Sequence, residues 1–123
     1  MLTYLITGSN RGIGLELCKQ IIARGDKVIA TCRKSSSDLK NLGVRIEEDI
    51  DISSEDSINN LRQALSGVDL DCLIHNAGIY EYNSIDDFDH ESIIRQFVVN
   101  ALSPLSVSYT HLTLPTSHNV ARA

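Results

Sequence analysis

The stretch "TGSNRGIG", Thr7–Gly14, places three glycines within eight positions near the start of the chain. It follows a short apolar run, Leu2–Thr7, that is typical of a buried strand. Beyond it, apolar residues recur at helical spacing: Ile13, Leu17, Cys18, Ile21 and Ile22. A strand that turns into a helix through glycines leaves helix N–H groups open to an anion. The stretch therefore predicts a turn that binds a pyrophosphate group. The alternative is that the glycines only allow a tight turn and bind no ligand. Its spacing is neither GxGxxG nor a P-loop, which needs a lysine after the last glycine.

Strand-like and helix-like segments alternate along the first hundred residues. The predicted strands are Leu2–Thr7, Lys27–Cys32, Val44–Glu48 and Leu70–Ile74. A predicted helix follows each of them; the third opens at "SSEDS" (Ser53–Ser57), and the last covers Ile93–Leu102 with an apolar stripe. Such alternation requires parallel strands, right-handed crossovers and helices on both faces. We predict an α/β fold: a doubly wound parallel sheet of the Rossmann type, present as an N-terminal four-strand fragment.

Composition limits the classes of function. The chain of 123 residues fits one small domain, and 42% hydrophobic residues suffice for a core. A net charge of −5 argues against a nucleic-acid partner. The three cysteines match no zinc spacing, and no run of about 18 apolar residues could cross a membrane. We expect a cytoplasmic protein with no metal, nucleic-acid or membrane partner.

Four motifs, in this order, resemble the short-chain dehydrogenase/reductase family over residues 2 to about 105. They are the glycine stretch, "DIS" at Asp51–Ser53, "HNAG" at His75–Gly78, and "VVNALSPL" at Val98–Leu105. The resemblance implies cofactor contacts from twelve residues: Gly8, Ser9, Asn10, Arg11, Gly12, Ile13, Gly14, Asp51, Ile52, Asn76, Ala77 and Gly78. It also implies that Asn100 belongs to the family's catalytic tetrad.

Some neighbouring residues admit a second interpretation. His75 departs from the family's NNAG, and we interpret it as a structural histidine. The resemblance implies that the acid of "DIS" contacts the adenine of the cofactor. Asp49 is an alternative to Asp51 for this contact, but only Asp51 is followed by polar residues that lead into a helix cap. The acidic residues before the last helix are interpreted as its solvated entrance, without a metal: Asp86, Asp87, Asp89 and Glu91.

The segment after the second predicted strand, "ATCRKS", indicates which nicotinamide cofactor is bound. An acid there holds a 2′-OH, whereas a 2′-phosphate needs a cation. Arg33 and Lys34 stand at the place of the acid, and Arg11 lies within the glycine stretch. Because arginine forms paired hydrogen bonds with phosphate oxygens, we predict NADP(H) in preference to NAD(H), with Arg33 as a cofactor-binding residue. The alternative is that these cations are only solvated.

The resemblance implies hydride transfer in which a tyrosine moves the proton, a lysine four residues later lowers its pKa, and a serine polarises the carbonyl. No Tyr-xxx-Lys pair occurs in this chain, whose last lysine is Lys40. The stretch "VSYTHLTLPT", Val107–Thr116, resembles a reading-frame translation of a transposon-end sequencing adapter. We therefore predict an incomplete NADP(H)-binding domain over residues 1–106 and a non-native tail over 107–123, with order ending near Ser106.

Two functions remain open on this basis. The first is the cofactor-binding part of an NADP(H)-dependent oxidoreductase that acts on a small carbonyl or alcohol, the chain itself being inactive. The second is a nucleotide-binding regulatory module without catalysis. A homo-oligomeric full-length protein is also left open.

Overall fold

A computed structural model describes residues 1–111, and the side chains as far as Tyr109. Its centre is a parallel sheet of four strands in the order β3-β2-β1-β4. The strands are β1 (Thr3–Ile6), β2 (Lys27–Thr31), β3 (Arg45–Glu47) and β4 (Cys72–Ile74). Leu5 of β1 is in register with Ile29 of β2 and Leu73 of β4. The predicted parallel α/β sheet is confirmed, with β4 at one edge.

The strands are shorter than the sequence predicts: β1, β2 and β3 each end one residue earlier, and β1, β3 and β4 begin one or two residues later. Single ladder bonds still continue past two of those ends. The Thr7 N–H donates to the Ile74 carbonyl at 3.1 Å, and the Cys32 N–H donates to the Glu47 carbonyl at 3.3 Å. The residues that directly follow β1 and β2 are therefore fixed to the sheet although they are not counted in it.

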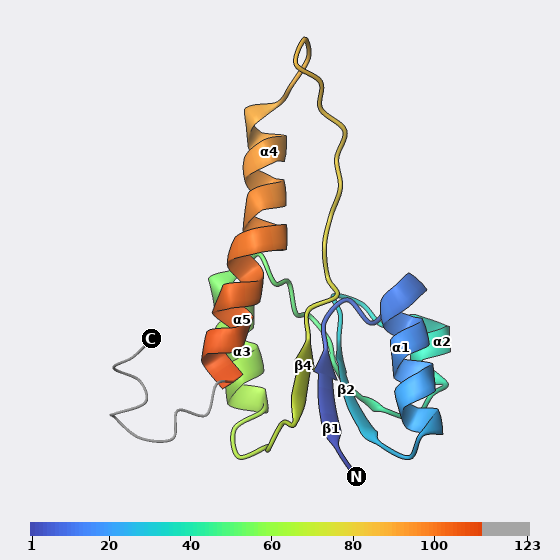
Figure 1. Cartoon of the computed structure of the whole chain (residues 1–123). Helices are drawn as coiled ribbons and strands as arrows, with labels where there is room; N and C mark the ends of the chain where they lie inside the picture. Colours follow the sequence, from blue (N-terminus) through green and yellow to red (C-terminus); the bar gives the residue numbers. More distant parts are fainter. Residues whose placement is uncertain (112–123) are drawn as a thin grey trace.

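Helices cover both faces of the sheet, as the doubly wound prediction requires. Figure 1 shows α1 (Gly12–Ala23) and α2 (Ser37–Lys40) on one side and α3 (Glu55–Ala64) on the other. Beyond β4 the chain forms α4 (His90–Phe97), a π-helical turn η1 (Val98–Leu102) and α5 (Ser103–His111), which lies beside α3. Ser36 and Ser54 begin α2 and α3 as side-chain caps.

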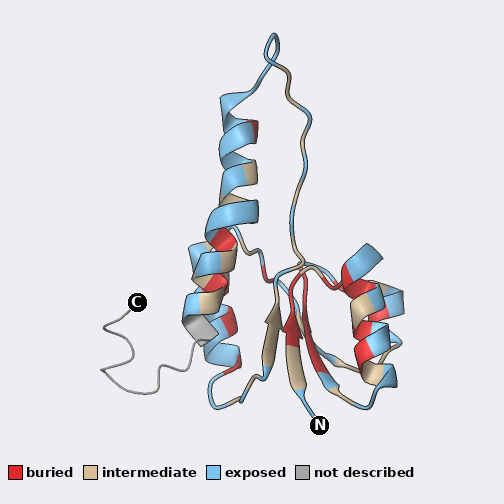
Figure 2. Ribbon diagram, in the orientation of Figure 1, coloured by how far each residue is buried: buried red, intermediate tan, exposed pale blue. Residues whose placement is uncertain are grey.

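Two apolar clusters fill the space between the sheet and these helices, and Figure 2 shows the buried strands between them. On the α1 side lie Ile6, Leu15, Cys18, Ile21, Val28, Ala30, Cys32 and Leu39. On the α3 side lie Leu5, Ile29, Ile50, Leu61 and Leu65. Burial of this area is the main free-energy gain that orders the strand ends.

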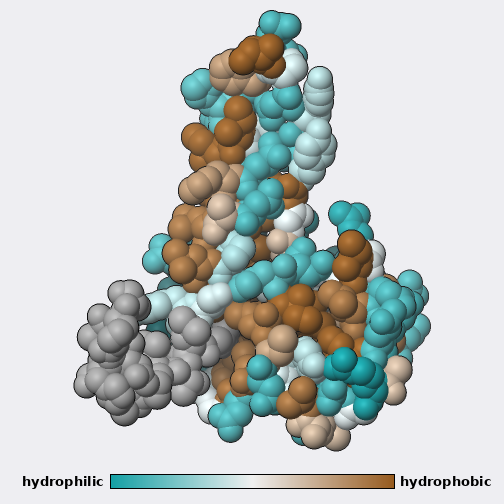
Figure 3. Space-filling view, viewed as in Figure 1, coloured by the Kyte–Doolittle hydropathy of each residue, from teal (hydrophilic) through white to brown (hydrophobic). Residues whose placement is uncertain are grey.

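The loop after β4 and α4 project away from the sheet, and Figure 3 shows hydrophobic side chains along this arm. The apolar stripe of the last predicted helix is exposed here: Ile93 is 46%, Ile94 60% and Phe97 62% exposed. Glu81 pairs with Arg95 at 2.7 Å and so ties the loop to α4. The arm is therefore held by polar contacts to itself and lacks an apolar partner within the described residues.

Ile13, which shares the helical spacing of the first predicted helix, is 73% exposed, because the helix begins at Gly12 and buries Gly14 and Leu15. One expectation about the end of the ordered chain is wrong. The order expected to end near Ser106 continues in α5 to His111. Val107 is 1% exposed, so burial of its side chain accompanies the continued helix.

Candidate functional site

The carboxyl ends of β1, β2 and β4 meet at one edge of the sheet, where ligands bind in open α/β sheets. The glycine-rich turn (residues 7–14) follows β1, the segment with Arg33 follows β2, and Asn76–Gly78 follows β4. Chain segments about seventy residues apart are thereby brought into contact, since the Ala77 N–H donates to Thr7 Oγ1 at 3.1 Å. The structure thus brings together two of the predicted motifs, the glycine stretch and "HNAG", beside the segment that carries Arg33.

Close packing explains two of the three glycines. Gly8 has φ +66°, and a Cβ on it would lie 2.8 Å from Ala77 Cα. A Cβ on Gly14 would overlap the Gly8 carbonyl oxygen and lie 2.6 Å from Asn76 Nδ2. Gly12 has φ +57° with open space at its Cβ position, so it is required by the backbone conformation alone. The glycine-rich turn gives up side chains mainly to pack against Asn76 and Ala77.

Thr7 is a residue that the predicted site omits, although it opens the quoted stretch. It is 1% exposed, and its Oγ1 accepts hydrogen bonds from the N–H groups of Asn76, at 3.2 Å, and Ala77. Asn76 Nδ2 donates to the Gly8 carbonyl at 2.9 Å. These bonds satisfy buried polar groups and lock the end of β4 to the glycine-rich turn. Their partners lie too far apart in sequence for any local pattern to reveal them.

Ser9 and Asn10 are both predicted to contact the cofactor. In the structure they form hydrogen bonds with other residues of the chain. Ser9 is buried and donates from Oγ to the Ile6 carbonyl at 2.7 Å and from N–H to the Thr31 carbonyl at 3.2 Å. Asn10 accepts two hydrogen bonds from Ser36, at Oδ1 and at the carbonyl oxygen. They hold the glycine-rich turn against β2 and the segment after it.

The first turn of α1 has no side-chain cap, so its N–H groups point out of the glycine-rich turn without a side-chain acceptor. Arg11, the N-cap residue, is exposed. Arg33 and Lys34 are exposed as well, and the three ion pairs found in residues 1–111 include none of these cations. Positive charge and open N–H groups therefore surround the same edge of the sheet, as an anion site requires.

Asp51 and Asp49 differ in how they are held. The Asp51 carboxylate accepts from the Oγ of Ser53 at 2.6 Å and from its N–H at 2.9 Å, and these bonds lower the pKa of Asp51. Asp49 adopts φ +60° and donates its N–H to the Arg33 carbonyl at 3.0 Å. Ile52 is half-buried against the apolar cluster on the α3 side. Asp51 thus opens a polar turn that leads to the cap of α3, and its adenine contact stays a prediction.

Asn100 lies within the π-helical turn, a geometry frequent at functional sites. Its Oδ1 accepts from the Ile79 N–H at 2.8 Å, and its Nδ2 donates to the Ile79 carbonyl at 2.7 Å. A Cβ on Gly78 would lie 3.1 Å from the same Oδ1. The Asn100 side chain therefore fixes the segment after "HNAG", and its catalytic role stays a prediction.

His75 contacts α5: its Nε2 lies 2.6 Å from Ser108 Oγ. Burial lowers the pKa of His75, so the neutral imidazole is favoured. The structural role expected for His75 stays a prediction, because Ser108 lies in the tail that is predicted to be non-native. Within residues 1–111, no group of three or more His, Cys, Asp or Glu residues could hold a metal ion, and no helix is long and apolar enough to cross a membrane.

Comparison with known proteins identifies the family. A family model described as short chain dehydrogenase matches residues 3–119. The chain belongs to the short-chain dehydrogenase family. One relative, 1-hydroxy-2-glutathionyl-2-methyl-3-butene dehydrogenase of Rhodococcus sp. (strain AD45), is 36% identical over 107 residues, which are 85% of this chain and 47% of that protein.

Solved short-chain dehydrogenase structures show the same fold. A short-chain dehydrogenase/reductase from Burkholderia multivorans with bound NADP is 30% identical with a TM-score of 0.81, covering 89% of this chain and 52% of that one. An NADPH-bound carbonyl reductase from chicken fatty liver is 28% identical with a TM-score of 0.75, covering 89% and 46%. The chain therefore spans about half the length of the relatives that it matches.

Proposed function

We propose that the chain is the N-terminal, cofactor-binding part of an NADP(H)-dependent short-chain oxidoreductase that acts on a small carbonyl or alcohol. The observation that carries the proposal is the packed junction of the glycine-rich turn with Asn76 and Ala77, beside the uncapped start of α1. A bound nicotinamide would supply hydride chemistry there. The protein's own contribution in this half is to hold the diphosphate through N–H groups and to place the cofactor with the segment that Asn100 fixes.

The first test asks whether the serine, tyrosine and lysine that the family uses for proton transfer are encoded after this part of the chain. Because the chain holds no Tyr-xxx-Lys, we propose that they follow Leu105 in the native reading frame, and that residues 107–123 are a non-native, adapter-derived tail. Sequencing the source DNA past the codon for Leu105 should reveal a serine and then a Tyr-xxx-Lys. A contiguous genomic read that reproduces "YTHLTLPTSHNVARA" and then stops would instead favour the regulatory module without catalysis.

The proposed preference for NADP(H) rests on the cations around the site. No acid stands between Lys27 and Ser37, and Arg11, Arg33 and Lys34 are exposed without ion pairs among the described residues. The two NADP(H)-bound relatives support the same preference. A guanidinium binds the 2′-phosphate of NADP(H) through charge-assisted hydrogen bonds. The neutral 2′-OH of NAD(H) forms no such bond with it and gains little binding energy.

Replacing Arg33 by aspartate tests this preference directly. In the full-length protein we expect NADPH to bind about 10 to 100 times more tightly than NADH, the worth of one or two charge-assisted contacts. Arg33→Asp should narrow or reverse this ratio, as measured by calorimetric dissociation constants for both cofactors. Arg62→Asp makes the same charge change on α3 and should leave the ratio unaltered. Equal affinities in the unmutated protein would contradict the preference.

We propose a cytoplasmic protein in which residues 1–106 are an incomplete NADP(H)-binding domain of the Rossmann type that continues into a longer protein. No nucleic-acid partner is proposed, because the net charge is −5. Homo-oligomerisation of the full-length protein stays open.

A further inference from the structure

The turn between β2 and α2 (residues 32–36, here the β2–α2 turn) is held by hydrogen bonds from two sides. On one side, Ser36 donates to Asn10: its N–H to Oδ1 and its Oγ to the carbonyl oxygen, the latter at 2.7 Å. On the other side, Ser35 donates to Glu48 Oε2 from N–H at 2.8 Å and from Oγ at 2.7 Å. The turn is therefore tied both to the glycine-rich turn and to the segment just after β3.

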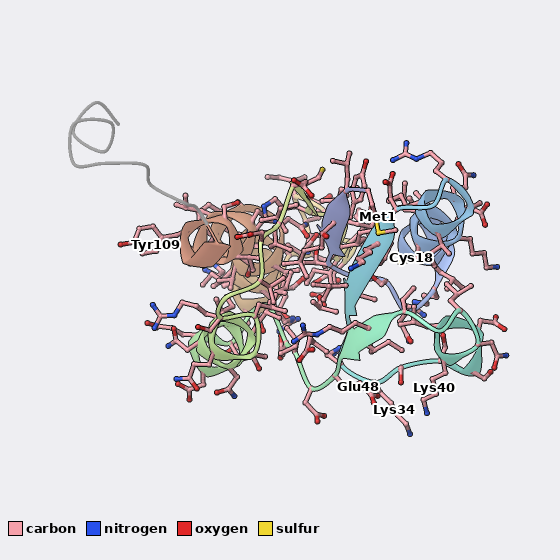
Figure 4. The ribbon with its side chains drawn as sticks, turned by 90° about the horizontal axis from the view of Figure 1, so that it is seen from below. Met1, Cys18, Lys34, Lys40, Glu48 and Tyr109 are labelled. Atoms are coloured by element: carbon pink, nitrogen blue, oxygen red, sulfur yellow. The ribbon has the colours of Figure 1, made fainter. Side chains whose placement is uncertain are left out.

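The two hydrogen bonds between Ser35 and Glu48 join a buried residue to an exposed one. Ser35 is 7% exposed, and both of its hydrogen bonds reach one carboxylate oxygen of an exposed Glu48. The N–H and hydroxyl of Ser35, aided by the charges of Lys40 and Lys34, lower the pKa of Glu48. Figure 4 shows Glu48, Lys34 and Lys40 at the same margin of the molecule. The Glu48 carboxylate is thus ionised, and its charge is partly offset by its neighbours.

The backbone of the β2–α2 turn is fixed further by the chain after Glu48. The Arg33 carbonyl accepts from the Asp49 N–H at 3.0 Å, and the Cys32 carbonyl accepts from the Ile50 N–H at 3.1 Å. The side chains of Arg33 and Lys34 remain exposed. A fixed backbone with accessible cations lowers the entropy lost when an anion binds, because only the side chains must become ordered.

We propose that Glu48 is a positioning residue for cofactor discrimination, which acts by holding the β2–α2 turn through Ser35. This inference rests on the proposed NADP(H) function. The turn carries Arg33 and Lys34, so its placement decides whether their charges reach the 2′-phosphate. Two physical effects of Glu48 have opposite signs. As a nearby negative charge it weakens phosphate binding, whereas as an anchor of the cations it strengthens phosphate binding. The buried, doubly bonded Ser35 indicates that anchoring is the larger effect.

The test compares two ligands that differ only in the 2′-phosphate. Dissociation constants of 2′,5′-ADP and 5′-AMP are measured by calorimetry on the full-length protein, and their ratio isolates the phosphate contact. Glu48→Ala should lower the preference for 2′,5′-ADP by about tenfold. Glu48→Gln keeps an acceptor for Ser35 without the charge and should stay within about threefold of the unmutated ratio. Glu47→Ala is the matched control, because this neighbouring acid pairs with Arg45 at 2.8 Å.

The 5′-AMP constant reports within each variant whether the rest of the site is folded. If Glu48→Ala also loses 5′-AMP, Ser35→Ala decides the question, with an expected fall in the ratio of about threefold. An unchanged or higher preference for 2′,5′-ADP in Glu48→Ala would overturn the inference alone, because Glu48 would then act only as a repelling charge. A Glu48→Gln variant as impaired as Glu48→Ala would also overturn it. An unmutated protein without any preference for 2′,5′-ADP would overturn the NADP(H) proposal itself, and this inference with it.

Discussion

Replacing Gly14 by alanine is expected to abolish cofactor binding and to lower the free energy of unfolding by about 2 to 4 kcal/mol. The added Cβ would overlap the Gly8 carbonyl oxygen and lie 2.6 Å from Asn76 Nδ2. Relief requires separating the glycine-rich turn from the end of β4, which breaks the 2.9 Å hydrogen bond between Asn76 and Gly8. Denaturant unfolding and NADPH titration of the full-length protein measure both effects.

Gly25→Ala is the matched control for this substitution. Gly25 has φ +89° and nothing within 4 Å of its Cβ position, so alanine there meets conformational strain but no collision. We expect a cost of about 1 to 2 kcal/mol and an unchanged dissociation constant for NADPH. A Gly14→Ala protein that binds NADPH normally would show that the glycine-rich turn is not the cofactor site.

The 123-residue chain expressed as it stands is expected to show no NADPH-dependent turnover of any carbonyl substrate. It has no tyrosine with a lysine four residues later, so proton transfer lacks its expected acid. We also expect it to be aggregated or molten, because β4 lies at an edge of the sheet with a row of backbone groups open to another chain. Ile94 and Phe97 of α4 add exposed apolar surface.

Light scattering measures whether the chain is aggregated. The loss of NADPH absorbance measures turnover of the carbonyl substrate. A net stability of about 5 to 15 kcal/mol for an intact domain leaves little margin when an edge strand and a helix face lack partners. The control is the protein from the extended reading frame, which should melt cooperatively and reduce carbonyl substrates. A monomeric 123-residue chain with a sharp cooperative melt and measurable turnover would contradict this prediction.

The four parallel strands and their helices could be predicted from sequence because local patterns encode them. Apolar runs that end in glycine or polar turns indicate buried strands, and serine caps mark the starts of α2 and α3. The strand boundaries were less accurate, since a strand ends where the neighbouring chain stops pairing with it. Ile13 shares the helical spacing of the apolar residues but is exposed, because the period of an apolar pattern does not fix the first residue of the helix.

The sequence by itself determined the fold class and the position of the glycine-rich turn, because short-range spacing of glycines and apolar residues decides both of them. The family was indicated by the resemblance of four motifs in their order along the chain. Only the tertiary structure decided what the glycines face. Thr7 meets Asn76 and Ala77, Asn10 meets Ser36, and Ser35 meets Glu48, over separations from 13 to 70 residues. These contacts exist because parallel strands bring their carboxyl ends to one edge of the sheet. The hydrogen bonds there depend on register and turn geometry, which no local pattern in the chain specifies.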